Sequence, residues 1–277
     1  MSKLQKIIIF SFVLCLGLTN IFAQTTSNIV RHDLSQAEID KIIKTFAHKE
    51  SEFREALKNY IFNRYVVVQT VGLGGQITGE LRRDSFMSIK ENGERFEKVL
   101  FAPISTIGDI MTPEDFEDLG GVNPFTIEPE SINQYNFNYL GKEKIDELNL
   151  YVFDISPKVI PDPKKSSQRM FVGRIWVDDQ DIQIVKSKGK AVPETKINKF
   201  AIVETWRENV DGKYWFPSYA LTTGKDGELV FDDGSVLRIK MRVKYTDYRQ
   251  GRSDVIILDD DDPKAKPTPT PTPKKPE

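Results

Sequence analysis

Two apolar runs joined by a short polar segment constrain the fold of this chain more than any other feature. Residues 170–177 and 182–188 are rich in β-branched and aromatic side chains, and residues 178–181 between them read Asp-Asp-Gln-Asp. Polar, turn-forming residues between two such runs are typical of a β-hairpin. Both faces of the first run are largely apolar, so we expect both to be covered and the strand to lie inside a sheet.

Further strand-like runs fill most of the chain after Tyr60. We predict strands over residues 60–71, 76–83, 85–91, 95–101, 135–140, 148–155, 200–207, 213–222 and 235–248. In the last run, apolar residues from Leu237 to Tyr245 alternate with cationic residues from Arg238 to Lys244, which predicts one buried and one solvated face. Solvation accounts for this cationic row, and contact with anionic lipid head groups is the alternative.

A single long helix is predicted before these strands. Ser35 and Glu38 form a capping-box pattern, in which each side chain can bond the backbone at the other position. Apolar residues then recur at helical spacing, namely Ile39, Ile42, Ile43, Phe46, Phe53 and Leu57. A helix of about 25 residues would be about 35 Å long, enough to cross a sheet. We therefore expect an α+β fold, mostly antiparallel β, in which a curved half-barrel sheet of roughly ten strands is wrapped on this helix.

The two ends of the chain differ in composition from the rest. Residues 1–23 have a basic start, a small residue at the end and an apolar run shorter than the roughly 20 residues that span a bilayer, the layout of a secretory signal peptide. An uncleaved membrane anchor is the alternative. We divide the chain into a signal peptide (1–23), an N-terminal extension (24–34), a half-barrel domain (35–258) and a disordered acidic and Pro/Thr-rich tail (259–277).

The residues that could support catalysis are few. His32 and His48 are in no zinc-binding pattern, and no Gly-x-Ser-x-Gly segment marks a hydrolase nucleophile. The single cysteine, Cys15, falls inside the predicted signal peptide, which leaves no thiol for a disulfide or a metal once that peptide is removed. The net charge is −2 with basic and acidic residues interspersed, which argues against nucleic-acid binding. We expect a protein that is not an enzyme and holds no cofactor or metal.

The hairpin also carries a resemblance to a known family. Residues 173–178, Gly-Arg-Ile-Trp-Val-Asp, followed by residues 182–185, Ile-Gln-Ile-Val, resemble the central hairpin of the bacterial outer-membrane lipoprotein-sorting proteins, the LolA/LolB-like superfamily. This resemblance implies a secreted chain with an N-terminal helix and a half-open barrel whose concave side holds acyl chains. It also implies that cargo passes from the inner to the outer membrane.

The predicted function follows from that resemblance and from the apolar strand faces. We expect a non-catalytic periplasmic carrier or sensor that binds lipid or lipoprotein acyl chains in an apolar groove, touches membranes only peripherally or transiently, and meets envelope protein partners. The predicted groove residues are Phe137, Tyr139, Phe153, Ile155, Trp176, Ile239, Met241 and Tyr245. One alternative is an envelope scaffold or regulatory module whose core is filled, similar to sigma-factor regulators of the same fold. An envelope hydrolase is the other, because converging carboxylates are invisible in a sequence.

Overall fold

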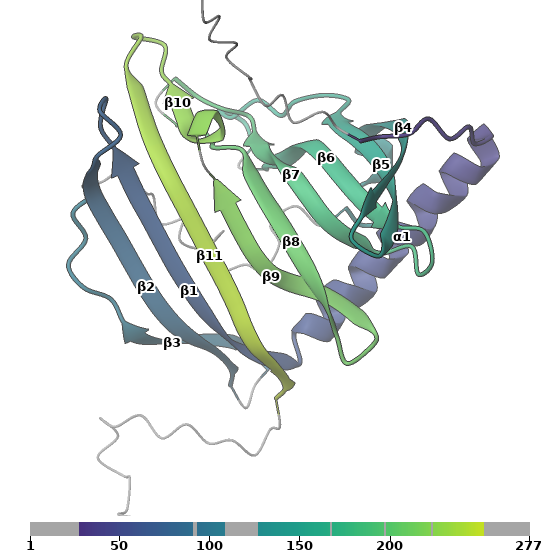
Figure 1. The fold of residues 1–277 in the computed structure, drawn as a ribbon, viewed down its shortest axis with the longest axis horizontal. Coiled ribbons are helices and arrows are strands. Elements are labelled where there is room, and N and C mark those ends of the chain that lie inside the picture. Colours follow the sequence, from purple (N-terminus) through teal and green to yellow (C-terminus); the bar gives the residue numbers. More distant parts are fainter. Residues whose placement is uncertain are drawn as a thin grey trace, which may run out of the picture.

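The computed structural model describes residues 28–90, 93–108, 127–166, 168–196, 198–222 and 224–251. Within these ranges the chain forms one α-helix, two short 3-10 helices and a large open antiparallel sheet that does not close into a barrel (Figure 1). The half-barrel expectation is therefore confirmed, with eleven strands in place of roughly ten. The predicted signal peptide and the predicted tail lie outside the described residues.

The order of the strands in the sheet places the first strand of the chain beside the last one. Their bounds are β1 Tyr60–Val71, β2 Ile77–Ile89, β3 Arg95–Phe101, β4 Tyr135–Ile145, β5 Leu148–Pro157, β6 Met170–Asp178, β7 Ile184–Val192, β8 Val203–Val210, β9 Tyr214–Thr222, β10 Glu228–Val230 and β11 Val236–Gln250. The sheet order is β3-β2-β1-β11-β9-β8-β7-β6-β5-β4, and β10 pairs with β11. The last strand thus lies between β1 and β9 and connects the two halves of the sheet.

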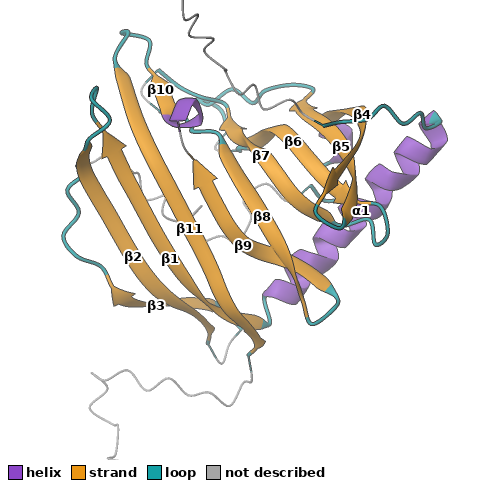
Figure 2. Cartoon of the chain, viewed as in Figure 1, coloured by secondary structure: helices purple, strands orange, loops and turns teal. Residues whose placement is uncertain are grey.

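Helix α1, Gln36–Leu57, lies across one side of this sheet (Figure 2). The capping box is present, since Ser35 accepts from the Glu38 N–H and the Glu38 carboxylate accepts from the Ser35 N–H. The helix has 22 residues, slightly fewer than expected. Its apolar stripe packs on two core clusters of the sheet: Phe46 contributes to a cluster built on β4 to β7, and Phe53 contributes to one built on β1, β2, β9 and β11. We call these clusters together the helix-side core.

The predicted hairpin is strands β6 and β7, and β6 lies inside the sheet between β5 and β7. Both of its faces are covered, as expected: Phe171, Ile175 and Val177 enter the helix-side core, while Trp176 packs on the opposite face. The alternate burial of these side chains fixes the register of the hairpin, because a slip by one residue would turn each of them to the wrong side.

Strand β7 continues through Gly189 to Val192, beyond the predicted end of the strand at residue 188. Gly189 lies opposite Gly173 on β6, and a Cβ added to Gly189 would lie 2.4 Å from the Val172 carbonyl oxygen and 2.5 Å from the Phe171 ring. The glycine is therefore required by the close approach of Phe171 rather than by the end of the strand.

Other boundaries differ from the prediction for local reasons. Strand β2 is continuous where two strands were predicted, because Arg83 and Asp84 at the expected interruption are held in the sheet by ion pairs with Glu97 and Arg82. Strand β8 begins at Val203 rather than at residue 200. The alternation in β11 is confirmed: Val243 and Tyr245 are buried, and the cationic residues between Lys240 and Lys244 are exposed.

Candidate functional site

The predicted groove residues are not brought to one place. The residues Phe137, Tyr139, Phe153 and Ile155 lie in or against the part of the helix-side core under the first half of α1. Met241 and Tyr245 belong to the part under its second half, and burial raises the pKa of the Tyr245 phenol to about 12. Trp176 is on the opposite face of the sheet. Ile239 is half-buried on β11.

The space between α1 and the sheet is filled by side chains. Phe46 and Phe153 are each 0% exposed, and their ring centroids lie 6.1 Å apart. A void of about 10 Å³ lies beside Glu50 and Arg207. An acyl chain could therefore reach Phe153 only if α1 moved away from the sheet.

One buried ion pair links α1 to the sheet at this interface. The Arg207 guanidinium on β8 donates from Nη1 to Glu50 Oε1 at 2.5 Å and from Nη2 to Glu50 Oε2 at 2.9 Å. The side chains are 4% and 2% exposed. The same guanidinium lies 4.6 Å from the ring centroid of Phe53. Such a pair fixes where the helix sits, because each charge needs the other once water is excluded.

The open cavity lies on the face of the sheet opposite α1. It has a volume of about 910 Å³ and is lined by residues of β4 to β8, so we call it the β4–β8 groove. Of the predicted groove residues, Trp176 lines it with its side chain. Phe137 and Ile155 also border it, but their side chains point to the other face of the sheet, in or against the helix-side core. The other apolar side chains of the lining are Val172 and Ile202. Carbon atoms form most of the exposed lining, including the methylene stems of long basic side chains.

The basic residues of the groove come from neighbouring strands. Lys186, Lys188 and Lys190 alternate along β7, and Arg174 lies beside them on β6, opposite Lys188. The sequence prediction missed these residues, although the pattern Lys-Ser-Lys-Gly-Lys over residues 186–190 places the lysines on one face of a strand.

Each of these cations is paired with a carboxylate. Arg174 donates to both oxygens of Asp154, at 2.7 and 3.1 Å, and this interaction raises the pKa of Arg174. The ammonium groups of the lysines lie close to further carboxylates: Lys186 is 3.2 Å from Glu204, Lys188 is 2.8 Å from Asp226, and Lys190 is 2.8 Å from Glu194. The groove is thus lined by alternating, mutually neutralised charges around an apolar floor.

Two tryptophans flank Lys186. Its Nζ lies 4.6 Å from the ring centroid of Trp176 and 4.0 Å from that of Trp206. The indole N–H of Trp176 donates to Glu143 at 2.7 Å, and that of Trp206 donates to Glu204 at 2.8 Å. These contacts hold one wall of the groove in a fixed geometry.

In the described part of the chain, no group of three or more His, Cys, Asp or Glu side chains is arranged to hold a metal ion. The described residues also include no helix that is both long and apolar enough to cross a bilayer. The β4–β8 groove offers a ligand two kinds of contact. Its apolar atoms can bury apolar parts of the ligand, and its paired charges can contact polar parts.

Comparison with known proteins finds similar solved structures. No protein-family model and no curated protein matches the chain. A DUF1329 family protein from Desulfovibrio piger is 10% identical, with a TM-score of 0.35 over 76% of this chain and 92% of its own. A LolA superfamily protein from Nitrosomonas europaea is 11% identical, with a TM-score of 0.33 over 74% and 94%. A putative outer membrane lipoprotein-sorting protein domain from Vibrio parahaemolyticus is 12% identical, with a TM-score of 0.33 over 76% and 93%.

The superfamily that the hairpin resembles is thus present among these structural neighbours. All three TM-scores are below 0.5, so the likeness carries no conclusion about what this chain binds.

Proposed function

We propose that this protein is a non-catalytic carrier or sensor of amphiphilic lipids in the bacterial envelope, and that it holds acyl chains of a lipid or lipoprotein in the β4–β8 groove. Trp176 is the predicted groove residue whose side chain contacts the cargo. The remaining ones contribute to the core of the fold. Residues 1–23 direct the chain to the periplasm, where its contact with membranes is peripheral or transient, and no cofactor takes part.

The observation that carries the proposal is the size and lining of the groove. Its volume of about 910 Å³ is near the upper end of the ~300–1,000 Å³ typical of small-molecule sites. Burial of each methylene contributes about 0.8 kcal/mol, so an acyl chain on Val172, Trp176 and Ile202 gains affinity without directional contacts. The paired charges around the floor suit a polar head group or the peptide end of a lipoprotein.

A second function is favoured by the filled space between α1 and the sheet. An envelope scaffold or regulatory module needs a rigid core and no cargo, and the full burial of Phe46 and Phe153 is consistent with that role. A carrier or sensor holds cargo in the groove and a scaffold does not, so the detection of bound cargo distinguishes the two functions.

Native mass spectrometry with lipid extraction tests the proposal on protein purified from the envelope of its own host. We expect bound lipid or acylated peptide at near-stoichiometric occupancy. Ile202→Glu places a carboxylate in the apolar lining and is expected to weaken lipid binding by about 10-fold or more, because the carboxylate must lose water when the chain binds.

Ile104→Glu is the matched control, since Ile104 is 94% exposed and is not among the residues that line the groove. It should bind lipid as the unmodified protein does. A clean apo mass, combined with no uptake of added phospholipid or lipopeptide, would rule out the carrier and leave the scaffold.

A further inference from the structure

The face of the sheet that bears the groove continues across β8, β9 and β11 to β1. Directly paired residues of antiparallel strands point to the same side, so the register identifies this face residue by residue. One transverse row runs from Lys186 to Trp206, Tyr219, Lys244 and Tyr65, each opposite the next on the neighbouring strand. The contact between Lys186 and the Trp206 ring shows that these side chains project from the groove side.

Strand β11 presents a row of exposed cations on this face. Lys240, Arg242 and Lys244 are all exposed and lie about 7 Å apart, twice the rise per residue of a strand. Their neighbours in the register are uncharged: Arg242 lies between Val67 and Leu221.

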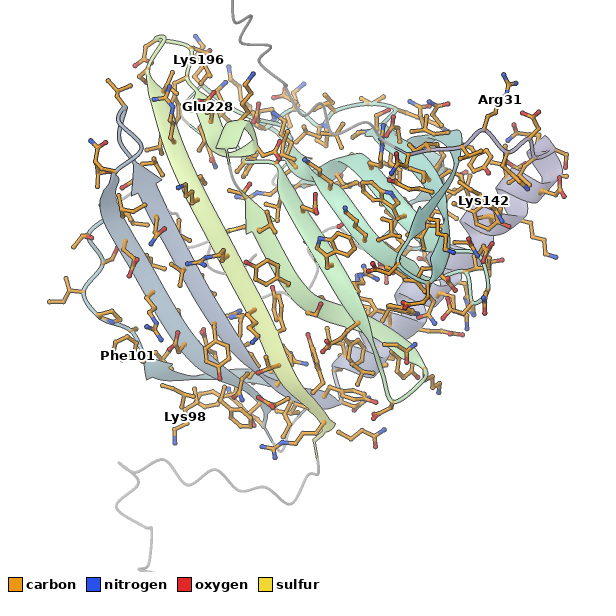
Figure 3. All side chains as sticks on the ribbon, viewed as in Figure 1. Arg31, Lys98, Phe101, Lys142, Lys196 and Glu228 are labelled. Atoms are coloured by element: carbon orange, nitrogen blue, oxygen red, sulfur yellow. The ribbon has the colours of Figure 1, made fainter. Side chains whose placement is uncertain are left out.

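These three cations differ from the other basic residues of the face because no carboxylate of the described residues lies within ion-pair distance of them. Arg238, two residues before Lys240 on β11, is paired with Glu228 at 2.9 Å, and Figure 3 labels Glu228 beside the first part of β11. Asp247, which follows Lys244 on the strand, accepts hydrogen bonds from Asn63 and Thr246.

Aromatic side chains with polar atoms flank the cationic row. Tyr219 and Tyr65 lie on either side of Lys244, and Tyr65 is 36% exposed. Tyrosine and tryptophan favour the boundary between lipid head groups and acyl chains, because each has an apolar ring and a polar atom. Unpaired lysine and arginine side chains near a bilayer attract anionic head groups.

We propose that this face of the sheet docks on an anionic membrane surface, with Lys240, Arg242 and Lys244 against the head groups and Tyr65 and Tyr219 beside them. Charge complementarity carries the choice of partner: the row is cationic although the whole chain has a net charge of −2. A broad sheet face fits the surface of a bilayer better than it fits a polymer, which would bind in a cleft. The docking orients the mouth of the β4–β8 groove toward the membrane. The docking does not depend on the cargo proposed above.

Co-sedimentation of the purified protein with vesicles tests the docking. We expect binding to phosphatidylglycerol vesicles at low ionic strength, little binding to phosphatidylcholine vesicles, and loss of binding at high salt. The triple variant Lys240→Gln, Arg242→Gln and Lys244→Gln should bind on the order of 100-fold more weakly, because each cation near the surface contributes about fivefold.

The matched control removes the same charge from the loop between β5 and β6. This control variant carries Lys158→Gln, Lys164→Gln and Lys165→Gln. The three lysines are exposed, and their replacement should leave vesicle binding nearly unchanged. The variant Ile202→Glu should also sediment with the vesicles, which separates docking from uptake of lipid into the groove.

Equal binding to both kinds of vesicle, or equal loss in the two triple variants, would overturn the proposal. Binding to soluble polyphosphate without binding to vesicles would also overturn it, in favour of an anionic polymer.

Discussion

Replacing Glu50 with alanine is expected to lower the free energy of unfolding by about 3–5 kcal/mol, since it leaves a buried charge without its partner. The Arg207 guanidinium is 4% exposed under α1, and it donates from both Nη1 and Nη2 to the Glu50 carboxylate. Chemical denaturation of the two proteins at neutral pH measures the difference. The loss should appear as a lower midpoint with little change in slope.

Two further variants make this prediction specific. Glu55→Ala removes a carboxylate from the exposed face of the same helix, where Glu55 is 71% exposed and paired with Lys58, and it should cost about 1 kcal/mol or less. The double variant Glu50→Leu with Arg207→Met should recover most of the loss, because no unpaired charge remains in the core. A loss in Glu50→Ala as small as that in Glu55→Ala would show that α1 is not held by the pair.

Acid is expected to destabilise the protein through Glu97 on β3. Its carboxylate accepts hydrogen bonds from Arg83 at 2.9 and 3.1 Å, from Ser85 at 2.5 Å and from Arg64 at 2.7 Å. Burial alone would raise the pKa of Glu97, but the hydrogen bonds from Arg83 and Ser85 and the charges of both arginines lower it to about 2.

The sign of the effect follows from this lowered pKa. Above pH 4.5 the carboxylate is ionised in both the folded and the unfolded chain, and its stabilising contribution is fully present. As the pH falls from 4.5 toward 2, the unfolded chain takes up the proton first and that contribution, about 3 kcal/mol, is lost. Denaturation of the unmodified protein and of Glu97→Gln at several pH values tests this.

The two proteins should differ strongly at pH 7 and converge near pH 2. Glu55→Gln serves as a control, because its exposed carboxylate should give no such convergence. A difference between Glu97→Gln and the unmodified protein that stays constant from pH 7 to pH 2 would contradict the assignment.

The elements that the sequence predicted are those with strong local signals. The capping box at Ser35 and the apolar stripe after it predicted α1, and the polar turn at residues 178–181 predicted the β6–β7 hairpin. The alternation from Leu237 to Tyr245 predicted which face of β11 is buried. Strand β10 was missed because Glu228–Val230 is too short to show an alternation.

The groove and the buried ion pair could not be predicted because both depend on distant contacts. Glu50 and Arg207 are 157 positions apart, and nothing near either residue indicates the other. In the groove, Lys186 meets Trp176 through a register that includes an irregularity between Trp176 and Val177. Alternation identified the apolar faces of the strands, but it cannot tell a filled face from a hollow one. Phe153 and Trp176 were therefore predicted to line one groove, although they lie on opposite sides of the sheet.

Photocrosslinking maps the proposed cargo site most directly. A fatty acid or lipopeptide with a photoreactive group near the middle of its acyl chain is bound to the purified protein and irradiated, and the modified peptides are identified by mass spectrometry. We expect the labels on the β4–β8 groove, at Val172, Trp176 and Ile202, and we expect Ile202→Glu to reduce them. Labels confined to α1 and Phe153, or no labels at all, would contradict the assignment of the groove as the cargo site.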